Sequence, residues 1–360
     1  MEIGVTYILS LEPAAAAWRG PQRLILKVAA EQITDVEYRF DLPLRSRSAS
    51  KLSPIQEVAQ SCPTCSQSHS LAFALAVEAL LGVSAPLRAS RIRLVAAECE
   101  RAISHLTTLE AIFTLMGVAT TAATLAEMRT RLSQGLTQLV GSSAEGVLVV
   151  PGGIRRDPSA ADGADLRSLL TTLSEQVYRL ADRVIDQRLI LARTVAVGSL
   201  SETAAAQFRL CGPLARASGL QTDVRVDAPY GAYAALAPQM IVQRSGDVYA
   251  RVVLLFLEAL ESLKLSDRAL DNLPDGAVMV ELPQSLPVAQ AEATVEAPRG
   301  ALRYRVEGDT KGELNFWVEP APQFDRLLAR TLLLQAAPDD ALLIALSTDP
   351  CSACQALRAM

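Results

Sequence analysis

Aromatic residues are scarce in this sequence: Phe, Tyr and Trp together make up 4% of its 360 residues, although 50% of the residues are apolar. Leu, Ala and Val must therefore supply most of the hydrophobic core. Ala and Leu favour helices, whereas β-sandwiches draw on β-branched and aromatic residues. The shortage of aromatic residues thus argues against a sandwich and favours packed helices.

An excess of basic residues is also missing, because the formal net charge is −5 at pH 7. Domains that bind DNA or RNA carry a basic patch or stripe that neutralises phosphates. This chain has no such excess of basic residues, so we expect no nucleic acid among its partners.

Long apolar runs are missing as well. The most apolar windows, residues 71–82 and 252–257, are shorter or more interrupted than the roughly 20-residue run that spans a bilayer. Residues 1–20 lack the basic region and apolar core of a secretory leader. We therefore expect a cytoplasmic protein with reduced thiols, in which paired cysteines indicate metal ligands or redox groups before disulfides.

Four of the six cysteines form two Cys-x-x-Cys pairs, Cys62 with Cys65 and Cys351 with Cys354. Two sulfurs at this spacing can bind one metal ion, and thiolates suit zinc, nickel or iron–sulfur clusters. Residues 66–350 separate the pairs, so the fold must bring distant parts of the chain together. Structural zinc is the commonest use of such pairs, and on spacing alone it stays open beside a buried redox metal.

The remaining cysteines and the two histidines carry weaker signals. His69 follows Cys65 by four residues, one helical turn, so its ring can reach a cysteine sulfur and border a bound cofactor. Its alternative role is that of a capping or core histidine. Cys99 and Cys211 lack sequence partners and are most simply buried small residues, and His105 is most simply structural.

Apolar periodicity predicts a mostly α (α+β) fold, with a central bundle of long helices and small peripheral β-hairpins. Leu166, Leu170, Leu173, Val177, Leu180 and Val184 form the stripe of one bundle helix. The predicted helices cover residues 66–81, 86–116, 120–139, 166–191, 247–263 and 324–334. In the fifth of these, residues 252–257 are apolar on every side and should lie at the bundle centre.

Strands are predicted at both ends of the chain. Residues 23–30 and 33–40 form one expected hairpin and residues 302–306 and 314–318 another, with a further strand at 278–282 and a buried strand or loop at 147–150. Residues 41–55 are expected to form a polar loop. We interpret residues 1–360 as a single domain, with a β-hairpin region over 1–45, a helical bundle over 60–272 and a mixed α/β part over 275–360.

The two cysteine segments resemble a known family. Cys62-Pro-Thr-Cys65-Ser-Gln-Ser-His69 together with Asp349-Pro-Cys351-Ser-Ala-Cys354 is similar to the paired signatures of nickel–iron hydrogenase large subunits. Glu296-Ala-Pro-Arg299-Gly300 looks like the family segment that places an arginine over the metal. Three further segments resemble the energy-converting, membrane-associated branch (group 4), which is related to the 49-kDa subunit of respiratory complex I: Gly212-Pro-Leu-Ala-Arg216-Ala-Ser-Gly219, Asp223-Val-Arg225-Val-Asp227-Ala-Pro-Tyr230 and Gly246-Asp-Val-Tyr-Ala-Arg251.

This resemblance implies a nickel–iron centre, with nickel held by Cys62, Cys65, Cys351 and Cys354. Cys65 and Cys354 would also bridge to an iron that carries carbon monoxide and cyanide. The complex I subunit has lost these cysteines, so their presence argues for a metal site over a quinone pocket. The chain is a divergent member, because the family arginine is replaced by Gln60 and the basic-glycine-acidic segment is missing from residues 41–55.

The first expected function is that of a catalytic subunit that interconverts protons and H2. Arg299 would supply a positive charge at the open metal position, and Cys351 would accept the proton as H2 splits. Electrons would leave through an iron–sulfur small subunit, because this chain has no spare cysteine cluster. Further expected partners are membrane-arm subunits, which would place the chain peripherally on the inner face of the membrane, and hydrogenase maturation proteins.

Three other functions stay open on the sequence. A large-subunit-like maturation scaffold would hold the iron fragment and need the cysteines without a proton path. A complex I-like coupling subunit would use a quinone or another acceptor. A zinc-stabilised interaction protein would need the cysteines for folding alone.

Overall fold

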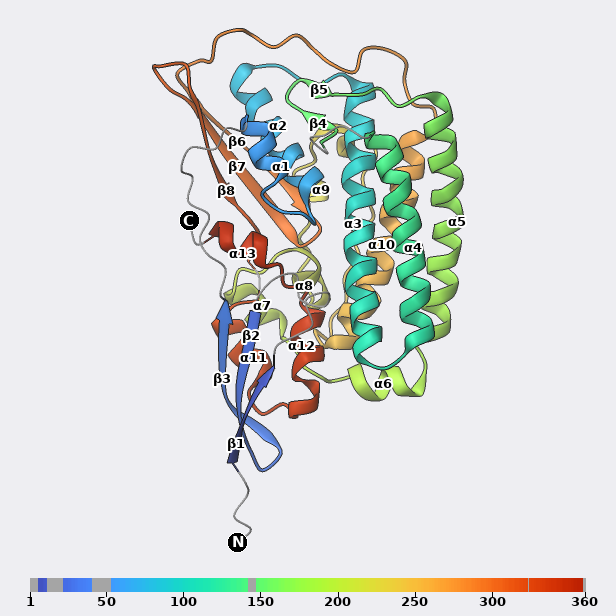
Figure 1. Ribbon diagram of the computed structural model, residues 1–360, viewed down its shortest axis with the longest axis vertical. Helices are drawn as coiled ribbons and strands as arrows, with labels where there is room; N and C mark the ends of the chain where they lie inside the picture. The colour runs from blue at the N-terminus through green and yellow to red at the C-terminus, as the bar shows by residue number, and fades with distance from the viewer. Residues whose placement is uncertain (1–5, 12–21, 41–52, 142–146, 323, 359–360) are drawn as a thin grey trace.

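The computed structural model describes residues 6–11, 22–40, 53–141, 147–322 and 324–358. The chain is mostly helical with small sheets, as predicted. Long helices stand together on one side of the molecule, and two three-stranded sheets with shorter helices lie on the other side (Figure 1).

The bundle contains α3 (Leu87–Leu115), α4 (Ala119–Val140), α5 (Ala160–Val184) and α10 (Val248–Leu270), which run side by side (Figure 1). All six residues of the predicted stripe on α5 are buried. Helix α3 lies between α4 and α10 and is buried along most of its length, so it links the bundle to the rest of the molecule.

Helix α5 is shorter than predicted. It ends at Val184, and a separate helix, α6 (Arg188–Thr194), crosses the lower end of the bundle (Figure 1). The next position of the stripe is Gln187, which offers no apolar side chain to bury and lies in extended backbone as the N-cap of α6. The predicted continuous helix over 166–191 is therefore wrong beyond residue 184. The all-round burial predicted for 252–257 is also wrong at its end, because Leu257 is 37% exposed.

The N-terminal sheet has the order β1-β2-β3 and is antiparallel. Strands β2 (Gln22–Ala29) and β3 (Gln32–Phe40) confirm the predicted hairpin, whereas β1 (Thr6–Leu11) was not predicted. Helix α11 (Arg326–Leu333) packs on β3 and corresponds to the predicted helix 324–334.

The C-terminal sheet has the order β6-β7-β8 and includes the predicted hairpin of β7 (Gly300–Gly308) and β8 (Leu314–Glu319). Its first strand, β6 (Gln290–Ala297), was missed although polar and apolar residues alternate along it, because three of its four apolar residues are alanine, which is depleted in strands. The strand predicted over 278–282 is wrong: Met279 forms only an isolated bridge with Gly153, and Pro283 follows. A proline cannot donate to a ladder, so pairing does not extend.

Helix α2 (Ser66–Leu81) packs on the C-terminal sheet and not within the bundle (Figure 1). Its Phe73 lies at a centroid distance of 5.4 Å from Phe316 on β8 and 6.0 Å from Tyr304 on β7. The helix ends at Gly82, whose φ of 67° is a left-handed cap. Helix α2 is therefore packed against the sheet whose β6–β7 turn carries Arg299.

Short elements make up the rest of the described chain. Helix α1 (Pro54–Ala59) begins with a capping box at Ser53, where a loop was predicted, and residues 41–52 of that loop lie outside the described ranges. The others are β4 (Val149–Val150), β5 (Gly153–Ile154), α7 (Glu202–Gln207), α8 (Gly212–Ala217), α9 (Val224–Asp227), η1 (Gly231–Ala234), η2 (Pro338–Asp340), α12 (Ala341–Ser347) and α13 (Ser352–Arg358). No helix of the described chain is long and apolar enough to span a bilayer.

Candidate metal centre

The four paired cysteines lie together where the start of α2 meets the start of α13. Cys62, Cys65, Cys351 and Cys354 form one buried cluster, and none is more than 4% exposed. The sulfurs of Cys62 and Cys351 are 3.7 Å apart, and the sulfurs of Cys62, Cys351 and Cys354 all lie within 4.8 Å of one another. Contacts across more than 280 sequence positions thus create the site.

This spacing suits metal binding and not a disulfide. All six cysteines lie in the described ranges, and no disulfide joins any of them. A disulfide needs a sulfur–sulfur distance of about 2.05 Å. Two thiolates that are each about 2.3 Å from one tetrahedral metal are about 3.8 Å apart, close to the separation of Cys62 and Cys351. The all-sulfur donor set fits a soft metal, but its spacing does not select among zinc, nickel and iron.

The thiols also interact with one another. Hydrogen bonds from Cys351, and then from Cys354 and Cys65, hold the pKa of Cys62 well below its usual range. Contacts with Cys351 and Cys62 raise the pKa of Cys354. The cluster therefore favours one thiolate that its neighbours stabilise by hydrogen bonding, and a bound cation would stabilise further thiolates.

Arg299 lies in the two-residue turn between β6 and β7 and reaches the cluster. Its Nη1 donates to the sulfur of Cys65 at 3.0 Å, its Nε to the carbonyl of Asp349 at 3.0 Å, and its Nη2 to Asp349 Oδ1 at 3.2 Å. The side chain is 7% exposed. The turn requires Gly300, whose φ is 118° and where an added Cβ would come within 2.7 Å of the Cys211 sulfur.

Asp349 connects this arginine to the bundle. Its Oδ1 also accepts a hydrogen bond of 2.7 Å from Thr108 on α3. Burial raises the pKa of Asp349, although Arg299 opposes the shift. The residue has a φ of 52°, an uncommon conformation for a residue with a Cβ, directly before Pro350 and Cys351. Asp349 thereby fixes both Arg299 and the turn that presents Cys351.

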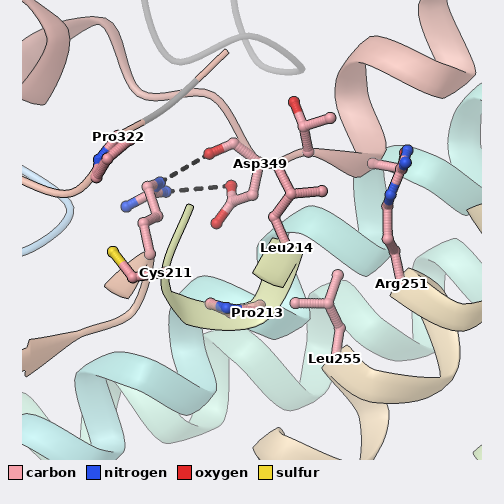
Figure 2. Close-up of a pocket in the computed structure, with 10 residues that line it drawn as sticks. Cys211, Pro213, Leu214, Arg251, Leu255, Pro322 and Asp349 are labelled. Atoms are coloured by element: carbon pink, nitrogen blue, oxygen red, sulfur yellow. Dashed lines mark hydrogen bonds and ion pairs between the residues drawn. The ribbon is translucent and has the colours of Figure 1, made fainter. Parts of the chain in front are cut away.

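A small cavity lies beside Arg299 and Asp349. Figure 2 shows Cys211, Pro213, Leu214, Arg251 and Leu255 around it. Its volume of about 20 Å³ has room for one water-sized molecule. Cys211 is half-buried here and not fully buried as predicted, whereas Cys99 is fully buried beside Ser266.

His69, on α2, contacts both the C-terminal sheet and the cysteine cluster. Its Nδ1 is 2.7 Å from the hydroxyl of Tyr304, and its Nε2 is 3.8 Å from the sulfur of Cys354. The sulfur that the ring approaches thus belongs to the second pair, although the sequence spacing linked His69 to Cys65. Tyr304 holds the ring in this orientation, as groups behind a metal ligand commonly do.

Some site residues were missed in the sequence. Thr64 lies between the first two cysteines, and its Oγ1 is 3.2 Å from the sulfur of Cys62 and 3.5 Å from Arg299 Nη1. In the sequence, only its position between Cys62 and Cys65 pointed to a role at the site. No sequence feature pointed to Tyr304 as a site residue, because only the packing of β7 against α2 brings it to His69.

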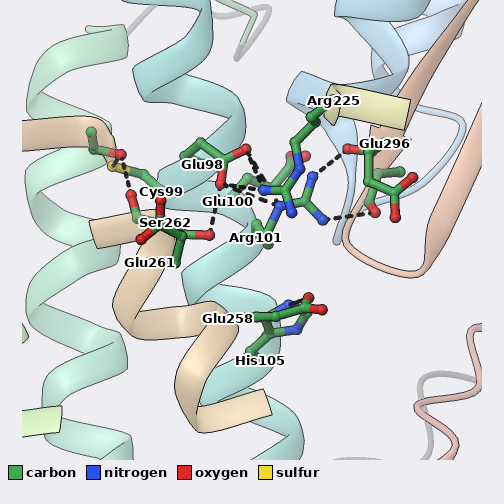
Figure 3. Close-up of polar contacts among 12 residues, drawn as sticks. Glu98, Cys99, Glu100, Arg101, His105, Arg225, Glu258, Glu261, Ser262 and Glu296 are labelled. Carbon is green, nitrogen blue, oxygen red and sulfur yellow. Dashed lines mark hydrogen bonds and ion pairs between the residues drawn. The ribbon is translucent and has the colours of Figure 1, made fainter. Parts of the chain in front are cut away.

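Buried charged residues from the other motifs form a second cluster, between the bundle helices α3 and α10 and the segments α8, α9 and β6 (Figure 3). Glu98 pairs with Arg101 and Arg225, and Arg216 pairs with Glu258 and Glu296. Burial alone would raise the pKa of Glu98, but Arg225 and Arg101 lower it to about 2. His105 Nε2 lies 3.1 Å from Glu258, so His105 is part of this network.

The chain is similar to several known proteins. Residues 116–293 match the family described as "Respiratory-chain NADH dehydrogenase, 49 Kd subunit". The chain is 28% identical to the carbon monoxide-induced hydrogenase of Rhodospirillum rubrum, over 97% of this chain and 99% of that protein. It is 31% identical to formate hydrogenlyase subunit 5 of Escherichia coli (strain K12), over 98% of this chain and 62% of that protein.

A solved structure shares the fold. The structure described as the membrane-bound sulfane sulfur reductase, an archaeal respiratory membrane complex, contains a chain that matches with a TM-score of 0.88. The match covers 97% of each chain at 24% sequence identity. The helical bundle and both sheets therefore form an arrangement that another protein also adopts.

Proposed function

Because the chain belongs to the family that includes the 49-kDa subunit of respiratory-chain NADH dehydrogenase and hydrogenases of group 4, we propose that it is the metal-binding large subunit of an energy-converting oxidoreductase complex. We further propose that it interconverts protons and H2. The observation that carries this proposal is the cluster of four buried cysteines with Arg299 hydrogen-bonded to one of its sulfurs.

The cofactor proposed for the cluster is a nickel–iron centre, held by Cys62, Cys65, Cys351 and Cys354. When bound, such a centre supplies an electron-rich metal that can polarise and split H2. The donor set fits, since four thiolates select soft metals. The iron with carbon monoxide and cyanide ligands is part of the proposal.

The chain's own residues supply charge and orientation. Arg299 is held on both sides by Asp349, so its guanidinium keeps a fixed place beside Cys65. Such preorganised charge acts strongly in a buried site, where little water screens it. The cavity beside Arg299 gives a water-sized molecule a position next to this charge.

Proton movement is assigned to the sulfur of Cys351. This atom lies 3.7 Å from Cys62 Sγ and 3.8 Å from Thr64 Oγ1. A thiolate at this position can accept a proton when a neighbouring hydroxyl or thiol relays it onward. Thr64, within reach of Cys62, Cys351 and Arg299, is the neighbouring hydroxyl that suits such a relay.

Electrons must leave through a partner. Outside the cluster this chain has only Cys99 and Cys211, which cannot hold a four-iron cluster. An iron–sulfur small subunit, membrane-arm subunits and maturation proteins are therefore proposed as partners, with the chain peripheral on the inner face of the membrane.

A second function is a complex I-like coupling subunit or a maturation scaffold without H2 turnover. The scaffold is favoured by Gln60 and by the absence, from residues 41–55, of the basic-glycine-acidic segment, whereas the retained cysteines argue against the coupling subunit. Metal analysis of the complex purified from its native host, followed by an H2 assay with artificial electron carriers, separates these functions. Nickel with iron and H2 turnover supports the first, iron alone supports the scaffold, and zinc alone contradicts both. Nickel and iron without H2 evolution or uptake would contradict the catalytic function.

A further inference from the structure

Helix α2, which carries Cys65 and His69, begins without a side-chain cap of its own. Its N-cap residue is Cys65, whose side chain makes no capping hydrogen bond. An N-cap side chain is ordinarily Ser, Thr, Asp or Asn and accepts from the next backbone amides. Ser159 on α5 and Asp247 on α10 do this in the present structure. At α2 the sulfur instead belongs to the cysteine cluster.

Glu100, from the neighbouring helix α3, supplies the missing acceptor. Its Oε1 accepts from the backbone amide of Gln67 at 2.7 Å. Its Oε2 accepts from the backbone amide of Ser68 at 2.9 Å and from the Ser68 hydroxyl at 2.6 Å. The Ser66 hydroxyl also donates to Oε1, at 3.4 Å. One carboxylate thus satisfies the second and third amides of the helix, which an N-cap side chain would otherwise serve.

The environment of Glu100 differs from that of most other buried carboxylates in the described chain. Glu78, Glu98, Glu258 and Glu296 each pair with an arginine or histidine, whereas among the residues that the structure describes no cation is bonded to Glu100. The side chain is nonetheless only 6% exposed. Burial raises the pKa of Glu100 to about 7, although the hydrogen bonds from Ser68 and Gln67 oppose the shift. The donors at the start of α2, with the positive end of the helix, therefore offset only part of the cost of burying this carboxylate.

We propose that Glu100 is a positioning residue for the cysteine centre: it caps α2 from another helix and thereby leaves the Cys65 side chain available to face the cluster. The inference rests on the proposed metal centre but not on H2 chemistry. Without Glu100, the unsatisfied amides would compete for the Cys65 side chain or fray the first turn, and the sulfurs of the first pair would lose their fixed direction.

The test compares Glu100→Gln with Glu78→Gln in the full chain. Glu78 connects the same two helices farther along, through Arg93 on α3, so it is a matched control for lost α2–α3 contact. Cadmium ion is the probe, followed by its thiolate charge-transfer absorption, and urea unfolding reports stability. We expect Glu100→Gln to bind cadmium about 10-fold more weakly or worse, within the range known for residues that orient metal ligands. Glu78→Gln should lose stability and keep cadmium affinity within twofold.

Two measurements on the metal-free chain test the cap itself. Iodoacetamide should alkylate Cys65 faster in Glu100→Gln than in Glu78→Gln. The second measurement is the shift in the urea unfolding midpoint that Glu100→Gln causes. This shift should be smaller in a Cys65→Ser chain than in the wild-type chain, because the serine hydroxyl can cap α2 in place of Glu100. Should Glu100→Gln fail to fold, Ser68→Ala removes one donor and should show the same pattern more weakly.

Equal cadmium affinity in Glu100→Gln and wild type, or equal weakening in Glu78→Gln, would overturn the positioning role. Equal midpoint shifts in the two backgrounds would also contradict it. A wild-type chain that binds no cadmium through these cysteines would instead refute the proposed metal centre, while the metal-free measurements would still decide the role of Glu100.

Discussion

At the scale of single residues, Arg299 combines three contacts that one lysine cannot reproduce. Its planar fork bonds Cys65 and both the carbonyl and the carboxylate of Asp349. Lysine keeps the charge but has a single, flexible ammonium group. These contacts lie on the face of the cluster where the proposed chemistry needs a fixed charge.

We predict that Arg299→Lys leaves nickel and iron bound but lowers H2 turnover by about 100-fold or more, the range for loss of one preorganised donor. Metal content per chain and H2 evolution, measured on the same purified complex, check this. A threefold change in turnover or a loss of metal would contradict the assigned role.

Cys351 tests the ligand set itself. Replacing Cys351 by Ser substitutes a hard oxygen for a soft sulfur, so we predict loss of most bound metal and not merely slower turnover. Cys99→Ser is the matched control, because Cys99 is fully buried but lies outside the cluster. Elemental analysis should show depleted metal for the first variant and normal metal for the second. Normal metal in both would exclude Cys351 as a ligand.

At the scale of elements, the β6–β7 turn places Arg299. We predict that Gly300→Ala destabilises the chain and lowers turnover, because its Cβ would meet the Cys211 sulfur at 2.7 Å and its φ is 118°. Gly312→Ala is the control: its φ is 78°, and nothing lies within 4 Å of the added Cβ. The control should lose only about 1 kcal/mol and keep full turnover. Similar unfolding and turnover in the two variants would show that the close approach at Gly300 does not matter.

At the scale of the whole molecule, buried ion pairs join the bundle to the segments that surround the site. Glu98 on α3 pairs with Arg225 on α9, while Arg216 on α8 pairs with Glu296 on β6. These pairs cross the boundary between the two hydrophobic cores, one in the bundle and one under the C-terminal sheet. The loss of one member would leave a buried arginine partly uncompensated.

We predict that Glu98→Gln lowers the free energy of unfolding at pH 7 by about 3 kcal/mol. The pKa of Glu98 falls from 4.5 to about 2 in the folded chain, so its stabilisation is present above pH 4.5 and is lost as the pH falls toward 2. The difference between variant and wild type should therefore shrink in urea titrations between pH 4.5 and pH 2.5. Glu175→Gln, in an exposed pair with Arg179, should change stability by less than about 0.5 kcal/mol. A difference that is independent of pH would contradict the ionised pair.

The sequence by itself determined what depends on local pattern. Apolar spacing identified the long helices, the Gly82 stop of α2 and the two hairpins, because periodic burial and turn residues act over a few positions. Residue spacing identified the two cysteine pairs as site residues, and the resemblance to a known family identified Arg299. Their roles as ligands and catalytic group stay predictions. The prediction failed at the end of α5, where the apolar stripe stops, and at β6, where alanine supplies most of the apolar positions and tertiary contacts select the strand.

Only the tertiary structure decided how the site is assembled. The meeting of the two cysteine pairs, the link from Tyr304 through His69 to Cys354, and the capping of α2 by Glu100 all join residues more than 30 positions apart. No periodicity encodes such contacts, since they arise when α2 packs between α3 and the C-terminal sheet. Packing of these large apolar faces sets the positions of the helices and strands. Those positions decide which polar side chains of the site come within contact distance of one another.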